Sequence, residues 1–269
     1  MDTFNFVRAQ TLAEAAAAFG QGSDARYLAG GQTLLPVMKQ RLAAPSDIIS
    51  LARVVGLTGV SVSSTLVTVG AMTRHAEVAA HEDIQAVLPA LSILAGGIGD
   101  PHVRNRGTIG GSLANNDPAA DYPAAVLGLG ARIVTGERTI SADDFFQGLF
   151  ATALLPGELI TRVEFPTPQR AGYVKFPHPA SRYALVGVMV SLGADGVRVA
   201  VTGAGACVFR VPQFELALAK NFSPGAIAGV TVADVDLTSD RAGSAEYRAH
   251  LIGVLAKRAV ALAVNGYQS

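Results

Sequence analysis

The chain has 269 residues, half of them hydrophobic, and its formal net charge is zero. This length is enough for two or three lobes with cores of their own, and the neutral charge argues against nucleic acid or an anionic membrane as a partner. The single cysteine excludes an internal disulfide and a four-cysteine iron–sulfur cluster within the chain, and no apolar run reaches the ~18 residues of a membrane span.

Residues 1–57 are predicted to form a small α/β lobe. Thr11 and Glu14 have the spacing of a capping box, which predicts a helix after them. A second helix is expected after Gly30 and Gly31. Short strands are expected at residues 5–9, 26–29 and 48–51. Because strands and helices alternate here, the strands are expected to be parallel.

Residues 58–174 are predicted to form a larger α+β lobe. Residues 83–95 have a helical pattern in which Pro89 marks a kink or a join between two helices. Strands are expected at residues 60–63, 66–70, 73–77, 132–135, 138–141 and 159–165.

Residues 175–269 are predicted to form a C-terminal unit, a three-stranded antiparallel sheet with helices. The turn signal Asp195-Gly196 predicts a hairpin between apolar runs on either side of it. The strands are expected at 184–194, 197–203 and 207–211, and a docked helix is expected at 246–264. The fold class of the whole chain is therefore α+β, with a two-lobed region before this unit.

The stretch from Tyr27 to Arg41, YLAGGQTLLPVMKQR, predicts a strand, a glycine turn and a helix. Glycine adopts positive φ at little cost and lets a ligand approach the backbone. Thr33 is the expected N-cap of the helix. Free N–H groups at such a turn favour an anion such as phosphate, whereas a tight turn without a ligand is the simpler alternative.

A second paired-glycine loop lies at Arg104 to Tyr122, RNRGTIGGSLANNDPAADY. Gly110 and Gly111 are followed by Ser112, whose hydroxyl suits a phosphate oxygen or a helix cap. Two such loops fit the two ends of one extended ligand, such as a diphosphate joined to a nucleoside.

Side chains for hydrolytic or metal chemistry are sparse. The five histidines have no metal-ligand spacing, and Ser112 stands in G-G-S rather than in a nucleophile motif. Asp143 and Asp144 are interpreted as charges at a helix start, and Cys207 as a core thiol. A bound redox cofactor places fewer demands on side chains, because the cofactor supplies the chemistry.

The two glycine loops carry a resemblance to a known family. AGGQTLLPVMKQR at 29–41 and TIGGSLANNDPAADYPA at 108–124 resemble the two FAD-binding motifs of the medium, flavin-carrying subunit of molybdenum hydroxylases. Carbon monoxide dehydrogenase, xanthine dehydrogenase and aldehyde oxidoreductase belong to this family. The resemblance covers nearly the whole chain.

This resemblance implies an oxidoreductase subunit that binds FAD and transfers electrons. A large partner subunit is expected to hold the molybdenum–pterin cofactor, and a small one to hold [2Fe-2S] clusters. FAD in this chain would pass electrons to an external acceptor, with NAD⁺, a quinone, a cytochrome and oxygen all open. A dimer of heterotrimers and a cytoplasmic location are expected, and attachment to the inner membrane face through partners stays open.

The resemblance also assigns cofactor-binding residues, by their match to the family motifs. The pyrophosphate is expected between the backbone N–H groups of the first loop, with the Thr33 hydroxyl, and the second loop. The residues with this role are Gly30, Gly31, Gln32, Thr33, Leu34, Thr108, Gly110, Gly111 and Ser112, and Ala29 and Ile109 are expected as further cofactor-binding residues of the two loops. Ala114 and Asn115 are expected near the flavin ring, Asp121 on a ribose or ribityl hydroxyl, and Leu159 at the adenine. Lys175 is expected near the flavin and Tyr183 against one ring face; an exposed lysine and a core tyrosine are the alternatives.

Two other functions stay open at this point. A free-standing FAD oxidase or reductase needs its own substrate pocket with acid and base groups at the flavin. A non-catalytic nucleotide-binding module needs only the loops.

Overall fold

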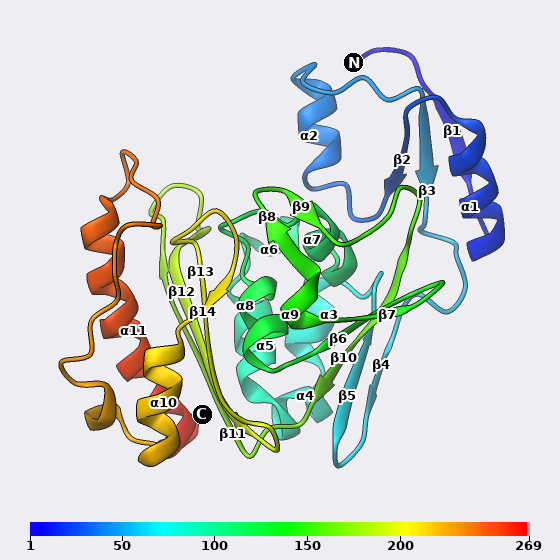
Figure 1. Cartoon of the computed structure of the whole chain (residues 1–269). Coiled ribbons are helices and arrows are strands. Elements are labelled where there is room, and N and C mark those ends of the chain that lie inside the picture. Colours follow the sequence, from blue (N-terminus) through cyan, green and yellow to red (C-terminus); the bar gives the residue numbers. More distant parts are fainter. Residues whose placement is uncertain (268–269) are drawn as a thin grey trace.

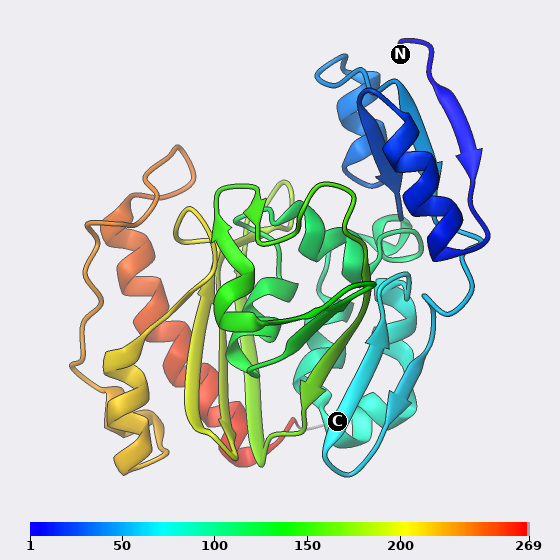
Figure 2. The ribbon, with the colours of Figure 1, turned by 45° about the vertical axis from the view of Figure 1, so that its right-hand side comes forward.

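The computed structural model describes residues 1–267. Three parts lie side by side in Figure 1: the N-terminal lobe in blue, a central lobe in cyan and green, and a C-terminal unit in yellow to red. The turned view keeps the central lobe between the other two (Figure 2). In the described part of the chain, no helix combines the length and apolarity that a bilayer crossing demands.

The N-terminal lobe is a three-stranded parallel sheet with two helices, as predicted. Its sheet has the order β1-β3-β2 and consists of β1 (Asn5–Arg8), β2 (Ala25–Leu28) and β3 (Asp47–Ser50). The helices are α1 (Leu12–Gln21) and α2 (Leu34–Lys39). Thr11 caps α1 by accepting a hydrogen bond of 3.1 Å from the Glu14 N–H. Because the strands are parallel, the segments after β2 and β3 lie at the same edge of the sheet.

The central lobe contains a five-stranded antiparallel sheet. In spatial order its strands are β4 (Val60–Val62), β5 (Leu66–Gly70), β10 (Ile160–Pro166), β6 (Arg132–Thr135) and β7 (Thr139–Ser141). The helices are α3 (His75–Ala80), α4 (Glu82–Val87), α5 (Pro89–Gly96), α6 (Pro101–Arg104), α7 (Ile109–Asn115), α8 (Tyr122–Gly128) and α9 (Ala142–Phe145). A small hairpin joins β8 (Phe146–Gly148) and β9 (Ala151–Thr152).

Two local predictions in this lobe have different outcomes. Pro89 begins α5 and thereby separates it from α4, so the join between two helices is confirmed. The strand predicted at 73–77 is wrong. The Glu77 carboxylate accepts a hydrogen bond of 2.7 Å from the Arg74 N–H, and this contact helps α3 to start at His75.

The C-terminal unit is a four-stranded sheet, not the predicted three-stranded one. Its strands, in order, are β11 (Arg170–Pro177), β12 (Ala184–Gly193), β13 (Gly196–Thr202) and β14 (Phe209–Arg210). The missed strand, β11, contains Gly172, which weakens a strand signal. A Cβ there would overlap the Ala259 carbonyl, so glycine lets the last helix approach the sheet closely. The helices are α10 (Pro212–Lys220), the 3-10 turn η1 (Pro224–Ile227) and α11 (Ala245–Asn265).

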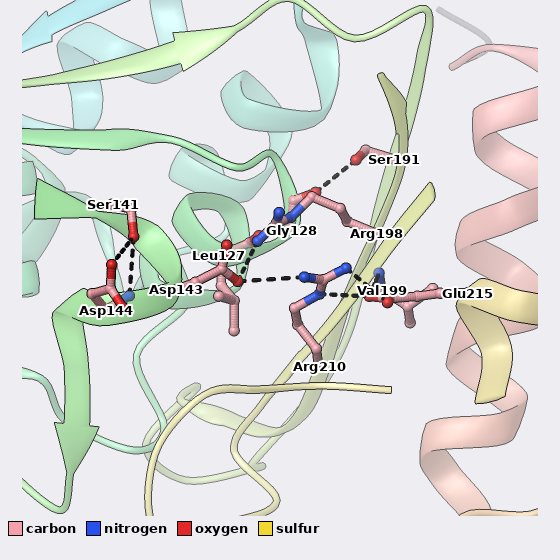
Figure 3. Close-up of polar contacts among 10 residues, drawn as sticks. All are labelled: Leu127, Gly128, Ser141, Asp143, Asp144, Ser191, Arg198, Val199, Arg210 and Glu215. Atoms are coloured by element: carbon pink, nitrogen blue, oxygen red, sulfur yellow. Dashed lines mark hydrogen bonds and ion pairs between the residues drawn. The ribbon is translucent and has the colours of Figure 1, made fainter. Parts of the chain in front are cut away.

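The C-terminal sheet is covered on both faces. Helices α10 and α11 pack on its outer face, and α5 and α8 of the central lobe pack on its inner face (Figure 1). Polar contacts strengthen this inner interface (Figure 3). Arg198 donates to the Leu127 carbonyl at 2.9 Å and pairs with Asp143 at 2.5 Å, while Ser191 donates to the Gly128 carbonyl at 2.6 Å. The central lobe and the C-terminal unit are therefore held in one fixed arrangement.

Candidate functional site

A cavity of about 860 Å³ lies where the three parts of the chain meet. This volume is within the range of small-molecule and cofactor sites. Its wall comes from the N-terminal lobe at residues 26–34, from the central lobe at 98–121 and 158–160, and from the C-terminal unit at 180–183. The cavity is therefore built for an elongated ligand that touches all three parts.

Most of the predicted site residues lie in this wall. Those that line the cavity are Ala29, Gly30, Gly31, Gln32, Thr33, Leu34, Thr108, Gly110, Gly111, Ser112, Ala114, Asn115, Asp121, Leu159 and Tyr183. Ile109 and Lys175 are not among the lining residues. Ile109 is fully buried in the core of the central lobe, because its side chain faces inward from the first turn of α7.

The first glycine loop presents unused backbone donors to the cavity. Among the hydrogen bonds of residues 1–267, none uses the N–H groups of Gly30 to Leu34, five successive residues of the wall. Gly31 makes the turn with a φ of +72°. Thr33 stands at the N-cap of α2, but its hydroxyl makes no capping bond, so the predicted cap is wrong in that respect. These N–H groups form a concave donor array of the kind that binds phosphate.

The second glycine loop is different, because its N–H groups already have partners. Ile109 donates to the Thr73 carbonyl at 3.2 Å, Gly110 donates to the Ala71 carbonyl at 2.8 Å, and Gly111 donates to the Thr108 hydroxyl at 3.2 Å. What this loop offers a ligand is side-chain chemistry, from Thr108, Ser112 and Asn115. The two loops, alike in sequence, therefore supply different groups.

Glycines allow the two loops to touch. A Cβ on Gly30 would overlap the Arg106 carbonyl and lie 2.7 Å from the Gly107 Cα. A Cβ on Gly111 would lie 3.0 Å from the Thr108 hydroxyl and 3.4 Å from the Ala29 Cβ. The N-terminal and central lobes are thus in direct backbone contact beside the donor array.

Asp121 also lines the cavity, and its carboxylate is bound by two side chains that do not line it. Its carboxylate accepts a hydrogen bond of 2.5 Å from the Tyr173 hydroxyl and pairs with the Lys175 ammonium at 2.9 Å. Burial raises the pKa of the Asp121 carboxyl, while Lys175 and Tyr173 oppose that rise by stabilising its ionised form. Lys175 is nearly buried, so the alternative of an exposed lysine is wrong.

Tyr183 lies in the loop between β11 and β12, whose residues Ala180 to Tyr183 line the cavity. Its side chain is about half exposed, at 46%, which excludes the alternative of a core position. Arg182 has a φ of +62°, unusual for a residue with a side chain, and this bend brings the loop over the cavity. The ring is therefore available to a ligand from one side.

Sequence analysis missed His75, which lines the cavity although it is 5% exposed. Burial, with a further effect of Arg104, lowers the pKa of His75 to about 4, so the imidazole is neutral at physiological pH. Its ring packs on Tyr122 with centroids 5.3 Å apart, and a Cβ on Gly107 would lie 2.5 Å from its Nε2. Metal-ligand spacing is the only signal for which the sequence analysis considers the histidines, and it does not report a buried imidazole in a cavity wall.

Comparison with known proteins places the chain in a family. Residues 2–168 match the family described as FAD binding domain in molybdopterin dehydrogenase. The nicotine 6-hydroxylase medium subunit of Paenarthrobacter nicotinovorans is 39% identical over 88% of this chain and 89% of its own. The carbon monoxide dehydrogenase medium chain of Hydrogenophaga pseudoflava is 35% identical over 96% of both chains.

Solved structures agree with the sequence comparison. A chain of the Hydrogenophaga pseudoflava carbon monoxide dehydrogenase that lacks the Mo-pyranopterin moiety of its cofactor superposes with a TM-score of 0.88. It is 34% identical, with 98% of each chain covered. Because the match extends over almost the full length in sequence and in structure, the chain belongs to the family of FAD-binding medium subunits of molybdenum hydroxylases.

Proposed function

We propose that this chain transfers electrons from iron–sulfur clusters of a partner subunit, through FAD in the cavity described above, to an external acceptor. The observation that carries the proposal is the array of five unused N–H groups at Gly30 to Leu34, at one end of a cavity that spans three structural units. A dinucleotide such as FAD has a pyrophosphate for that array and two ring systems for the rest of the cavity.

The residues present fit FAD. The pyrophosphate would lie on the N–H groups of Gly30 to Leu34, with the hydroxyls of Thr108 and Ser112 facing it. Leu159 would contact the adenine, and Asp121 a ribose or ribityl hydroxyl. Ala114, Asn115 and Tyr183 would border the flavin ring. Lys175 does not line the cavity and would support the site by pairing with Asp121. Ile109 would support it through the packing of α7 in the core of the central lobe.

When bound, FAD supplies the redox chemistry, accepting electrons singly or in pairs. The chain supplies binding and shielding. Every carboxylate that lines the cavity already accepts a hydrogen bond from the protein. These carboxylates belong to Asp100, Asp117, Asp121 and Glu158. The hydrogen bonds accepted by Asp100 and Glu158 lower the pKa of both carboxyls, which makes these two groups poor general bases and supports electron transfer over direct oxidation of a substrate by this chain.

We further propose the assembly that the family suggests. A large molybdenum–pterin subunit and a small [2Fe-2S] subunit would join this chain, in a dimer of heterotrimers located in the cytoplasm. Within the chain we propose functional units at 1–57, 58–174 and 175–269. The start of β11 at Arg170 and the family match up to residue 168 favour moving the second boundary to 169.

Co-purification tests this proposal. The tagged chain is isolated under native conditions, and its flavin, molybdenum and iron contents are measured. We expect a large and a small partner chain, both metals, and about one flavin per trimer. A solitary yellow protein that oxidises substrates unaided would favour the free-standing flavoenzyme. A colourless protein that cannot be reconstituted with FAD would contradict the proposal.

A further inference from the structure

Three segments of the cavity wall are tied to one buried ammonium group. The Lys175 Nζ donates to the Gly97 carbonyl at 2.7 Å and to the Arg182 carbonyl at 3.2 Å, and it pairs with Asp121 at 2.9 Å. An ammonium has three N–H donors, so this set uses them all. Gly97 precedes the cavity-lining segment 98–100, Asp121 lies at the start of α8, and Arg182 lies in the β11–β12 loop.

Asp121, the charged partner of Lys175, also accepts a hydrogen bond from Tyr173. Tyr173 is 5% exposed, does not line the cavity, and reaches the carboxylate from β11 with a hydrogen bond of 2.5 Å. Space for its hydroxyl exists because residue 187 on the neighbouring strand is glycine. A Cβ on Gly187 would lie 2.6 Å from the Tyr173 oxygen.

Tyr173 is also fixed through its backbone, by a contact that does not involve the cavity. Its N–H donates to the Tyr267 hydroxyl at 2.8 Å, near the C-terminal end of the chain. The side-chain contact and the backbone contact of Tyr173 are therefore separable by mutation. One is directed at the cavity wall, and the other holds β11 against the end of the chain.

We propose that Tyr173 is a positioning residue of the FAD site: its hydroxyl orients the Asp121 carboxylate, which holds the Lys175 ammonium where it ties the three wall segments together. This inference rests on the proposed function. Without the hydroxyl, Asp121 loses a donor to its charged form and Lys175 loses part of its anchor. The wall between Gly97 and Arg182 then loosens around the ligand.

The test is a titration of the full chain with FAD at a series of pH values. Binding is measured by the quenching of flavin fluorescence. Tyr173→Phe removes only the hydroxyl, and we expect FAD affinity to fall about tenfold, as for loss of one hydrogen bond to a charged group. Gly187→Ala keeps the hydroxyl but displaces it, so a similar loss is expected. Tyr267→Phe is the matched control, since it removes the tyrosine hydroxyl that accepts from the Tyr173 backbone N–H and does not touch Asp121.

The pH profile separates positioning from a general loss of stability. Tyr173 and Lys175 from β11, Tyr122 from α8 and Tyr183 from the β11–β12 loop are the titratable groups that face Asp121. Asp121 is the one carboxylic acid in this set of groups. Affinity is expected to fall as Asp121 becomes protonated, and in Tyr173→Phe this fall should occur at higher pH, because the ionised form has lost a donor.

Three outcomes overturn the inference, and they are distinguishable. Wild-type affinity and an unshifted pH profile in Tyr173→Phe, with FAD bound normally by the wild type, would refute the role of Tyr173 alone. A wild-type chain that cannot bind FAD, alone or with partners, would refute the proposed function and the inference with it. Equal affinity losses in Tyr173→Phe and Tyr267→Phe, with equal shifts of the profile, would assign the effect to β11 stability instead.

Discussion

Replacing Gly31 by alanine tests whether the first loop binds the pyrophosphate. Gly31 has a φ of +72°, and a left-handed conformation costs a residue with a side chain roughly 1–2 kcal/mol. The new Cβ would lie 2.8 Å from the Leu35 Cδ1, the end of a flexible side chain that can move. Backbone strain is therefore the main effect, and the loop can relieve it by rotating the N–H groups of Gly31 and Gln32 away from the cavity.

The size of the effect on binding follows from those two donors. A hydrogen bond to a charged group contributes about 1.5–3 kcal/mol, so losing two weakens FAD binding by roughly 3–6 kcal/mol, or about 10²- to 10⁴-fold in Kd. The assay is FAD titration of the purified variant, paired with its thermal unfolding.

A matched control separates binding from backbone strain. Gly56 has a φ of +84°, a Cβ added there meets no atom within 4 Å, and the residue does not line the cavity. Gly56→Ala should therefore lose a similar 1–2 kcal/mol of stability while FAD affinity stays unchanged. If Gly31→Ala loses stability in the same way but binds FAD as the wild type does, the first loop does not hold the pyrophosphate.

Three further changes have defined outcomes. Gly111→Val should abolish flavin absorbance while limited proteolysis shows the C-terminal unit intact, because the branched side chain enters the cavity beside Thr108. Asn116→Gly keeps the left-handed backbone but deletes the amide that donates to both carbonyls of the β8–β9 hairpin, and should lower the free energy of unfolding by about 1–3 kcal/mol in a urea titration. Hydrogen bonds from Arg138, the Leu155 N–H and Thr135 lower the pKa of Glu158 from 4.5 to about 2. The ionised carboxylate therefore stabilises the fold above pH 4.5, and this stabilisation is lost as pH falls toward 2. Glu158→Gln should lose on the order of 3 kcal/mol at neutral pH, with a melting temperature that converges on the wild-type value in acid.

Local sequence signals predicted much of the fold. The Thr11–Glu14 cap and the turn at Asp195-Gly196 depend on neighbouring residues, and both are present in the structure. The missed strand β11 depends on distant contacts instead. Glycine is needed at position 172 because the Ala259 carbonyl of α11, more than eighty positions later in the chain, leaves no space for a Cβ. No pattern within the strand predicts this contact.

The site was predictable as a set of residues but not as a set of roles. Resemblance to the family found fifteen of the residues that line the cavity, and thirteen of them lie in the two motifs, which are continuous stretches of sequence. Lys175 is predicted near the flavin, and the structure shows in addition that its ammonium faces Asp121 and two carbonyls. Whether a side chain faces a ligand or supports a neighbour is decided by packing between strands, which the motif does not contain.

The paired glycines show why similar sequences have different functions here. Gly31 is needed for a positive φ, which leaves five N–H groups free. Gly110 is needed for close packing, since a Cβ would lie 2.6 Å from the Ala71 side chain and the residue's own N–H already bonds to the Ala71 carbonyl. A substitution in the first loop should therefore reduce FAD affinity directly. A substitution at Gly110 should separate α7 from its neighbouring segment and reduce affinity only through a change in the shape of the cavity.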